Sequence, residues 1–154
     1  MLISTNYFSC IDLEKAYDRV SWEFLDGILT ELRIPPNFKR IIMNCVTSTS
    51  INILWNGEKT DTFKPSRGLR QGDPLSPYLF VLCMEKLSQV IEDCLDEGEW
   101  RALRAGMSGP CISHLFFADD IILFGEASLR QADCMMRCLN LFCNASGQRV
   151  SSIF

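Results

Sequence analysis

Two adjacent aspartates, Asp119 and Asp120, interrupt an otherwise apolar stretch. The runs on either side, 112–118 and 121–124, have the length of two strands in a hairpin with the aspartates between them. Two-residue turns prefer Asn-Gly or Asp-Gly, and neighbouring carboxylates repel each other. A divalent cation would remove that repulsion. The pair therefore indicates either a metal site or an ordinary polar turn, and its spacing alone leaves both open.

A third carboxylate, Asp12, lies near the end of another apolar run, 7–13. If that strand neighbours the 112–124 hairpin, three carboxylates meet at one edge of a sheet. Oxygen ligands suit Mg²⁺ or Mn²⁺. Two such ions, roughly 3.5–4 Å apart, activate a hydroxyl nucleophile and stabilise a leaving pyrophosphate. Nearby, Glu14 is interpreted as a solvated acid and Asp18 as a helix cap.

The segment 66–77 is a loop rich in glycine, proline and arginine. Gly68 and Gly72 let backbone amides approach a ligand closely. Arg67 and Arg70 bring positive charge to the start of a helix, where the helix dipole favours anions. A nucleotide or a template strand would fit such a loop, and a basic surface loop is the plain alternative.

The elements that must position these groups follow from apolar periodicity. Asn56-Gly57 between two alternating runs predicts a further hairpin. The helix after Pro36 should bury Phe38, Ile41, Ile42 and Cys45. The order of elements favours an α+β fold, an antiparallel sheet with helices on one face. Helices are expected over 21–32, 36–46, 75–96 and 128–144.

Bulk composition limits the classes of function. A chain of 154 residues with 47% hydrophobic and 22% charged residues fits one globular domain. The longest apolar run, 78–84, is far shorter than the roughly 18 residues a membrane helix needs, so no membrane partner is expected. The net charge of −4 lacks the basic excess typical of an autonomous nucleic-acid binder.

Eight cysteines occur, and none forms a Cys-x-x-Cys pair. Most lie in apolar periodic stretches, where free cysteine behaves as a small buried hydrophobe. This pattern predicts a reducing intracellular compartment, without distinguishing nucleus from cytoplasm. Cys134, Cys138 and Cys143 with His114 form a conceivable zinc set, but core packing is the favoured interpretation.

Together these segments resemble the palm of the reverse transcriptase domain of non-LTR (LINE-type) retrotransposons, especially the branch abundant in plant genomes. Residues 11–18 are similar to the family's first palm motif and 66–77 to its second. Residues 117–120 are similar to the third, the aspartate pair on a hairpin, and 146–148 to the start of the fourth. The motifs occur in the family's order and span almost the whole chain.

The resemblance implies an RNA-directed DNA polymerase with a reverse-transcriptase palm fold. Its partners would be an RNA template, a DNA primer and deoxynucleoside triphosphates, and its cofactor two Mg²⁺ (or Mn²⁺) ions. Metal ligation falls to Asp12, Asp119 and the backbone carbonyl of Leu13. Asp120 supports the same site as a further ligand.

The resemblance also implies a nucleotide and template pocket. Arg70, Gln71 and Gly72 would line it. Tyr17 stands where the family places an aromatic that excludes a ribose 2′-hydroxyl; a core tyrosine beside Trp22 is the alternative. Phe117 would pack under the primer end, with plain core as its alternative.

Residues 1–154 are accordingly expected to form a single, partial reverse transcriptase domain: a palm without the start of the fingers and without the thumb. Such a chain should be weak or inactive alone. The alternative is a non-catalytic palm remnant that acts as an RNA or protein interaction module.

Overall fold

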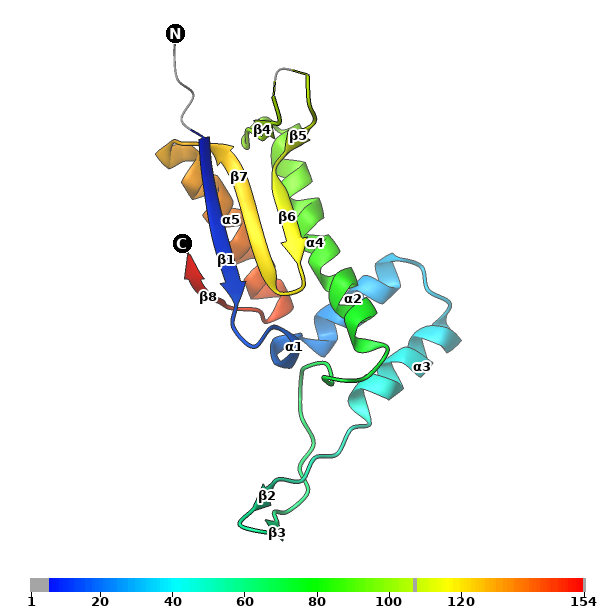
Figure 1. Ribbon diagram of the computed structural model, residues 1–154. Helices are drawn as coiled ribbons and strands as arrows, with labels where there is room; N and C mark the ends of the chain where they lie inside the picture. The colour runs from blue at the N-terminus through cyan, green and yellow to red at the C-terminus, as the bar shows by residue number, and fades with distance from the viewer. Residues whose placement is uncertain (1–5, 107, 154) are drawn as a thin grey trace.

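A four-stranded antiparallel sheet forms the centre of the molecule (Figure 1). The computed structural model describes residues 6–106 and 108–153. The strand order is β6-β7-β1-β8, and all neighbours are antiparallel. The strands are β1 (Asn6–Leu13), β6 (His114–Phe117), β7 (Asp120–Glu126) and β8 (Val150–Ile153).

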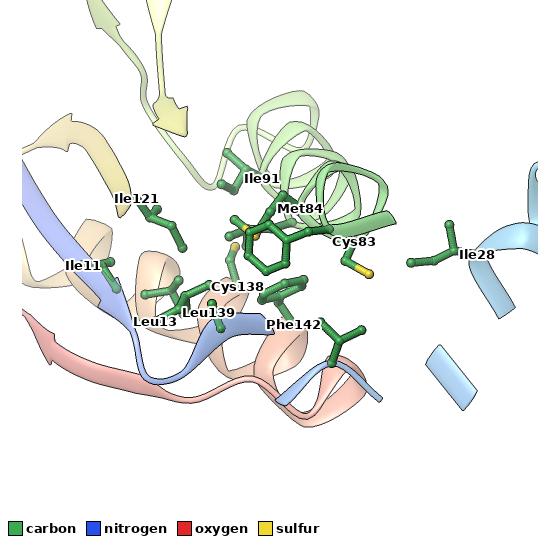
Figure 2. Close-up of a cluster of buried hydrophobic side chains, with 14 of the residues drawn as sticks. Ile11, Leu13, Ile28, Cys83, Met84, Ile91, Ile121, Cys138, Leu139 and Phe142 are labelled. Carbon is green, nitrogen blue, oxygen red and sulfur yellow. The ribbon is translucent and has the colours of Figure 1, made fainter. Parts of the chain in front are cut away.

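Two long helices, α4 (Ser76–Asp96) and α5 (Leu129–Ser146), pack against each other and cover one face of this sheet (Figure 1). Side chains alternate along a strand, so every second residue of β1 and β7 points at the helices. Figure 2 shows strand residues Ile11, Leu13 and Ile121 meeting helix residues of the same core. The predicted α+β architecture, a small antiparallel sheet with helices on one face, is confirmed.

Helix boundaries follow the capping signals in the sequence. Ser21 caps α2 (Trp22–Glu31) by accepting a hydrogen bond from the Phe24 amide. Ser128 caps α5 in the same way through the Gln131 amide. Gly147 ends α5 with φ of 79°, a left-handed conformation that glycine adopts readily. None of the helices in the described part of the chain is long and apolar enough for a bilayer crossing.

The helix α3 (Pro36–Thr47) begins at its proline as expected, but its predicted apolar face is wrong. Only Ile42 is buried, whereas Phe38 and Ile41 are each 56% exposed and Cys45 is exposed as well. The helix lies at the periphery and contacts α2 along a narrow strip (Figure 1). Met43 and Val46 pack partly against the core, so α3 buries a narrower face than predicted and leaves Phe38, Ile41 and Cys45 exposed.

The hairpin predicted at Asn56-Gly57 is present and projects away from the body of the molecule (Figure 1). Asn56 and Gly57 have φ of 50° and 85°, as a two-residue turn of the favoured kind requires. The remaining elements are short. They are the hairpin strands β2 (Leu54–Trp55) and β3 (Glu58–Lys59), the paired strands β4 (Leu103–Arg104) and β5 (Cys111–Ile112), and the single turn α1 (Ala16–Arg19).

The glycine-rich loop before α4 is fixed to α1 and the start of α2 by three hydrogen bonds. The Gly68 amide donates to the Val20 carbonyl at 2.8 Å, and the Leu69 amide donates to the Tyr17 carbonyl at 2.7 Å. The Trp22 indole Nε1 donates to the Gly68 carbonyl at 2.8 Å. The loop therefore has a defined position beside the end of β1.

Gly68→Ala should destabilise the fold more than Gly72→Ala. Both glycines have positive φ, 96° and 85°, so alanine costs about 1 kcal/mol of backbone strain at either position. A Cβ at Gly68 would also lie 2.8 Å from the Asp18 carbonyl oxygen, whereas a Cβ at Gly72 meets nothing within 4 Å. Urea unfolding should show an additional loss of at least about 1 kcal/mol for Gly68→Ala. Equal losses would mean that the loop does not dock on α1.

Candidate active site

The first predicted site residue, Asp12, lies directly opposite Asp120 in the antiparallel pairing of β1 with β7. One position away, Ile11 pairs with Ile121, and both isoleucines are buried beneath the helices. Because successive side chains alternate between faces, Asp12 and Asp120 share the open face of the sheet, where both are exposed. The predicted adjacency of β1 and the aspartate hairpin is confirmed.

The turn of that hairpin differs from the prediction by one residue. Ala118 and Asp119 form the turn, and Asp120 already belongs to β7, where it pairs with Phe117. Ala118 supplies the positive φ of 54° that the reversal needs. The prediction that Asp119 and Asp120 together separate the strands is therefore wrong. As a consequence, Asp120 is held in the strand ladder opposite Asp12, while Asp119 lies in the turn beside it.

The three carboxylates share one edge of the sheet without converging on a point. Among the described residues, the one group of three or more candidate ligand atoms within 4.8 Å of one another consists of cysteines elsewhere in the molecule. The Asp12 carboxylate instead accepts a 2.6 Å hydrogen bond from the Ser151 hydroxyl on β8. The donor set suits a hard divalent cation, since it consists of exposed carboxylate oxygens with side-chain freedom to turn towards an ion.

Two residues beside the carboxylates have left-handed backbone. Lys15, three positions after Asp12, has φ of 50°, and Ala118, immediately before Asp119, has φ of 54°. Such conformations cost energy in residues other than glycine and gather at functional sites. Both reversals keep the carboxylates at the ends of their strands. Leu13 pairs with Val150 after a register shift at Asp12, so the backbone bends where its carbonyl was predicted to bind metal.

The residues predicted to bind nucleotide or template divide between two places. Arg70 and Gln71 line a cavity of about 780 Å³, together with residues of the segments 49–52 and 65–69. This volume lies in the range typical of ligand pockets. Gly72 follows in a turn, with φ of 85°, and is not part of the cavity wall.

Tyr17 packs against the hydrophobic core, and its carbonyl and the Trp22 indole bind adjacent residues of the glycine-rich loop. Its ring stacks on Phe80 of α4 with centroids 4.7 Å apart and planes inclined by 15°. The side chain is half-buried and its carbonyl holds the glycine-rich loop through Leu69. Tyr17 therefore connects the end of β1 to both α4 and the loop.

Phe117 is exposed beside the carboxylates, and β8 contributes a hydrogen bond to Asp12 that sequence reasoning did not find. Phe117 is 81% exposed beside Asp120, so its interpretation as plain core is wrong. Ser151 contacts Asp12 across a separation of 139 residues, and no pattern in the sequence indicated its strand. Arg149, just before β8, lies 3.9 Å from the Glu14 carboxylate.

Comparison with known proteins gives a family match along nearly the whole chain. Residues 2–152 match the family described as reverse transcriptase (RNA-dependent DNA polymerase). The chain is 51% identical over 65 residues to an uncharacterized mitochondrial protein of Arabidopsis thaliana. The matched region covers 42% of this chain and 53% of that protein. It is 28% identical over 123 residues to the Pol polyprotein of the type-2 retrotransposable element R2DM of Drosophila melanogaster, covering 80% of this chain and 11% of the polyprotein.

Solved structures show the same fold. The telomerase of Candida albicans, in complex with a TWJ fragment of telomeric RNA, superposes with a TM-score of 0.72 at 14% identity. The match covers 97% of this chain and 27% of the telomerase chain. This chain thus spans about half of one relative and much smaller parts of the others. With its palm-like sheet and the family match over residues 2–152, the chain belongs to the reverse transcriptase (RNA-dependent DNA polymerase) family, on its non-LTR retrotransposon side.

Proposed function

We propose that this chain is the palm of a non-LTR retrotransposon polymerase that adds deoxynucleotides to a DNA primer along an RNA template. The observation that carries the proposal is the pairing of Asp12 with Asp120 on the open face of the sheet, with Asp119 in the adjoining turn. Two strands separated by a hundred residues of sequence thus present carboxylates at one edge. The family match supports the reaction class, since reverse transcriptases use divalent metal ions.

In this proposal Asp12, Asp119 and Asp120 hold two Mg²⁺ or Mn²⁺ ions, with the Leu13 carbonyl as a further ligand. When bound, the ions supply activation of the primer hydroxyl and charge neutralisation on the departing pyrophosphate. The protein supplies position. The strand ladder fixes Asp12 opposite Asp120, and the exposed ring of Phe117 offers an apolar support beside them for the primer end.

The cavity beside α1 supports the assignment of substrate contacts. Arg70 brings positive charge and Gln71 an amide to its wall, which suits the phosphates and base edges of a nucleotide or template. Tyr17, stacked on Phe80, sets the position of the loop that carries both residues and is the candidate for excluding a ribose 2′-hydroxyl. Gly72 would allow close approach of a ligand to the backbone, because a Cβ built at this position would meet no described atom within 4 Å and glycine leaves that space open.

The relatives support the remaining partners. The telomerase neighbour was solved with telomeric RNA and the R2DM relative is a retrotransposon polyprotein, which favours an RNA template here. The Arabidopsis relative favours the plant-like branch. Eight free thiols favour a reducing intracellular compartment, either nucleus or cytoplasm. We take residues 1–154 as one palm unit that works with fingers and thumb of a parent enzyme.

Mn²⁺ should stabilise the wild-type chain against thermal unfolding. An ion that binds only the folded carboxylates adds about 2.7 kcal/mol at one hundred times its Kd. Asp119→Asn should remove most of this gain. The matched control is Asp61→Asn, which removes the same charge from an exposed loop residue outside the site. The midpoint of thermal unfolding, measured with and without Mn²⁺, gives the stabilisation of each variant. Equal stabilisation of Asp119→Asn and Asp61→Asn by Mn²⁺ would exclude the aspartates as ligands.

The 154-residue chain assayed alone should extend a primer only at background level. Phosphoryl transfer depends on aligning primer, template and triphosphate, and the carboxylates do not provide that alignment. The net charge of −4 also gives little general attraction for nucleic acid, so RNA binding should be weak and salt-sensitive. The assay uses an annealed primer on an RNA template, four deoxynucleotides and Mg²⁺. Sustained extension that disappears in Asp119→Ala would show that the palm alone suffices.

A second function, a protein interaction module, is favoured by one observation. The outer part of the molecule exposes apolar side chains on α3 and on the segment that carries the β2–β3 hairpin. Contiguous exposed apolar surface is typical of interaction sites. These residues are Phe38, Ile41, Ile51, Ile53, Leu54, Trp55 and Phe63.

Replacing Ile41 with serine should therefore weaken association of the chain with itself or with captured proteins, because it removes exposed apolar area from α3. Leu129→Ser is the control, since Leu129 is equally apolar and 86% exposed but lies on α5. Sedimentation across a concentration series and capture from a lysate measure the effect. If both variants behave alike, the α3 surface is not an interaction site.

A further inference from the structure

Three cysteines meet between the two long helices, on the side of the sheet opposite the aspartates. Cys94 lies on α4, and Cys134 and Cys138 lie one turn apart on α5. All three sulfur atoms are within 4.8 Å of one another, and the Sγ atoms of Cys94 and Cys138 are 3.3 Å apart. Cys138 lies in the core where α5 faces α4 (Figure 2).

This set corrects the zinc grouping considered from the sequence. His114 is absent from it, because its two ring nitrogens lie within hydrogen-bonding distance of the Ser88 and Ser113 hydroxyls, at 2.8 and 2.9 Å. Cys143 is absent as well, and Cys94 takes part instead. The sequence did not indicate that Cys94 takes part, because Cys94 lies on α4 and is distant in sequence from Cys134 and Cys138 on α5.

The spacing of the sulfurs fits a tetrahedral metal. Zinc–sulfur bonds of about 2.3 Å in tetrahedral geometry place the sulfurs about 3.8 Å apart. In the structure one sulfur–sulfur distance is 3.3 Å and the other two are at most 4.8 Å, so the 3.8 Å separation lies within the range observed. Small shifts of side chains would therefore complete three corners of a tetrahedron. Sulfur ligands select Zn²⁺ over Mg²⁺ or Mn²⁺.

The surroundings supply charge compensation. Zn²⁺ with three thiolates carries one net negative charge. The guanidinium of Arg137 forms an ion pair with Glu99 and lines the same cavity as Cys134. Binding of Zn²⁺ to cysteine releases the thiol protons, so the site would take a cation with high affinity for thiolate.

The cluster is also accessible from one side. A cavity of about 500 Å³ is lined by Glu99, Arg130, Asp133, Cys134 and Arg137. An ion can enter from this cavity, and its fourth coordination position would face it. Water or the Glu99 carboxylate can occupy that position, since Glu99 lines the same cavity as Cys134.

We propose that Cys94, Cys134 and Cys138 form a Zn²⁺ site that ties α4 to α5. The site has three thiolate ligands and a fourth position open to the cavity. It is structural, because it joins the two helices that cover the sheet and lies on the far side of that sheet from the candidate catalytic edge. The proposal does not depend on polymerase activity.

Zinc binding is tested on the full 154-residue chain, kept reduced and freed of metal by a chelator. Titration with Zn²⁺ should reach one ion per chain in the presence of excess Mg²⁺. Co²⁺ in its place should give the thiolate charge-transfer band and the visible bands of a tetrahedral site. Zn²⁺ should also protect Cys94, Cys134 and Cys138 from alkylation, as identified by peptide mass spectrometry, and raise the melting temperature.

Cys94→Ser and Cys138→Ser should each lower Zn²⁺ affinity by more than the 10–100-fold typical of losing an outer-shell partner. Cys83→Ser is the matched control: Cys83 is another buried thiol of α4, outside the cluster, whose pKa burial raises to about 12. Asp119→Asn should bind Zn²⁺ like the wild type, which separates this site from the candidate catalytic edge.

Two results would overturn the proposal. One is the absence of thiol protection by Zn²⁺ in the reduced wild-type chain, which needs no variant to fold. The other is unchanged Zn²⁺ affinity in folded Cys94→Ser and Cys138→Ser. A Cys94–Cys138 disulfide formed with glutathione disulfide, in a chain that takes up no Zn²⁺ when reduced, would identify the cluster as a redox pair instead.

Discussion

The pairing of β1 with β7 determines where every other group of the candidate active site lies. Ile11 and Ile121 face each other beneath the helices, and this fixes Asp12 opposite Asp120 on the other face. A slip of one residue would turn a carboxylate into the core and an isoleucine into water, which is strongly unfavourable. Apolar packing therefore holds together acids that repel each other. In the proposed metal site, the strand pairing would place Asp12 and Asp120 side by side on one face without help from an ion.

The second constraint is the attachment of the glycine-rich loop to α1. Tyr17 stacks on Phe80, its carbonyl accepts the Leu69 amide, and Trp22 holds the Gly68 carbonyl. The end of β1, the loop and the start of α4 are thus joined by direct contacts. Because Asp12 ends the same strand, the carboxylate edge and the cavity wall share a common support. In the proposed polymerase this common support would keep the candidate metal ligands at a fixed separation from the candidate nucleotide contacts.

Sequence patterns predicted the elements well where periodicity and capping agree. Ser21, Ser128 and the Asn56-Gly57 turn lie where local chemistry alone places them. Patterns failed where tertiary neighbours decide. Phe38, Ile41 and Cys45 of α3 are exposed because this peripheral helix buries only a narrow face, so periodicity overestimated its burial. The aspartate turn shifted by one residue because pairing with β1 draws Asp120 into the ladder. The contact of Ser151 with Asp12 spans too much sequence for any local signal to report.

The sheet also separates two chemistries that sequence alone cannot tell apart. Carboxylates gather on its open face, where water and long polar ligands reach them, and thiols gather between the helices that cover the other face. Hard cations prefer oxygen and soft cations prefer sulfur, so the two faces offer ligands for different classes of ion. Burial also separates the two sets, because Cys134 and Cys138 are buried whereas the carboxylates are exposed. In the proposed zinc site the sheet and its covering helices would therefore keep a sulfur-bound ion apart from ions that exchange at the open edge.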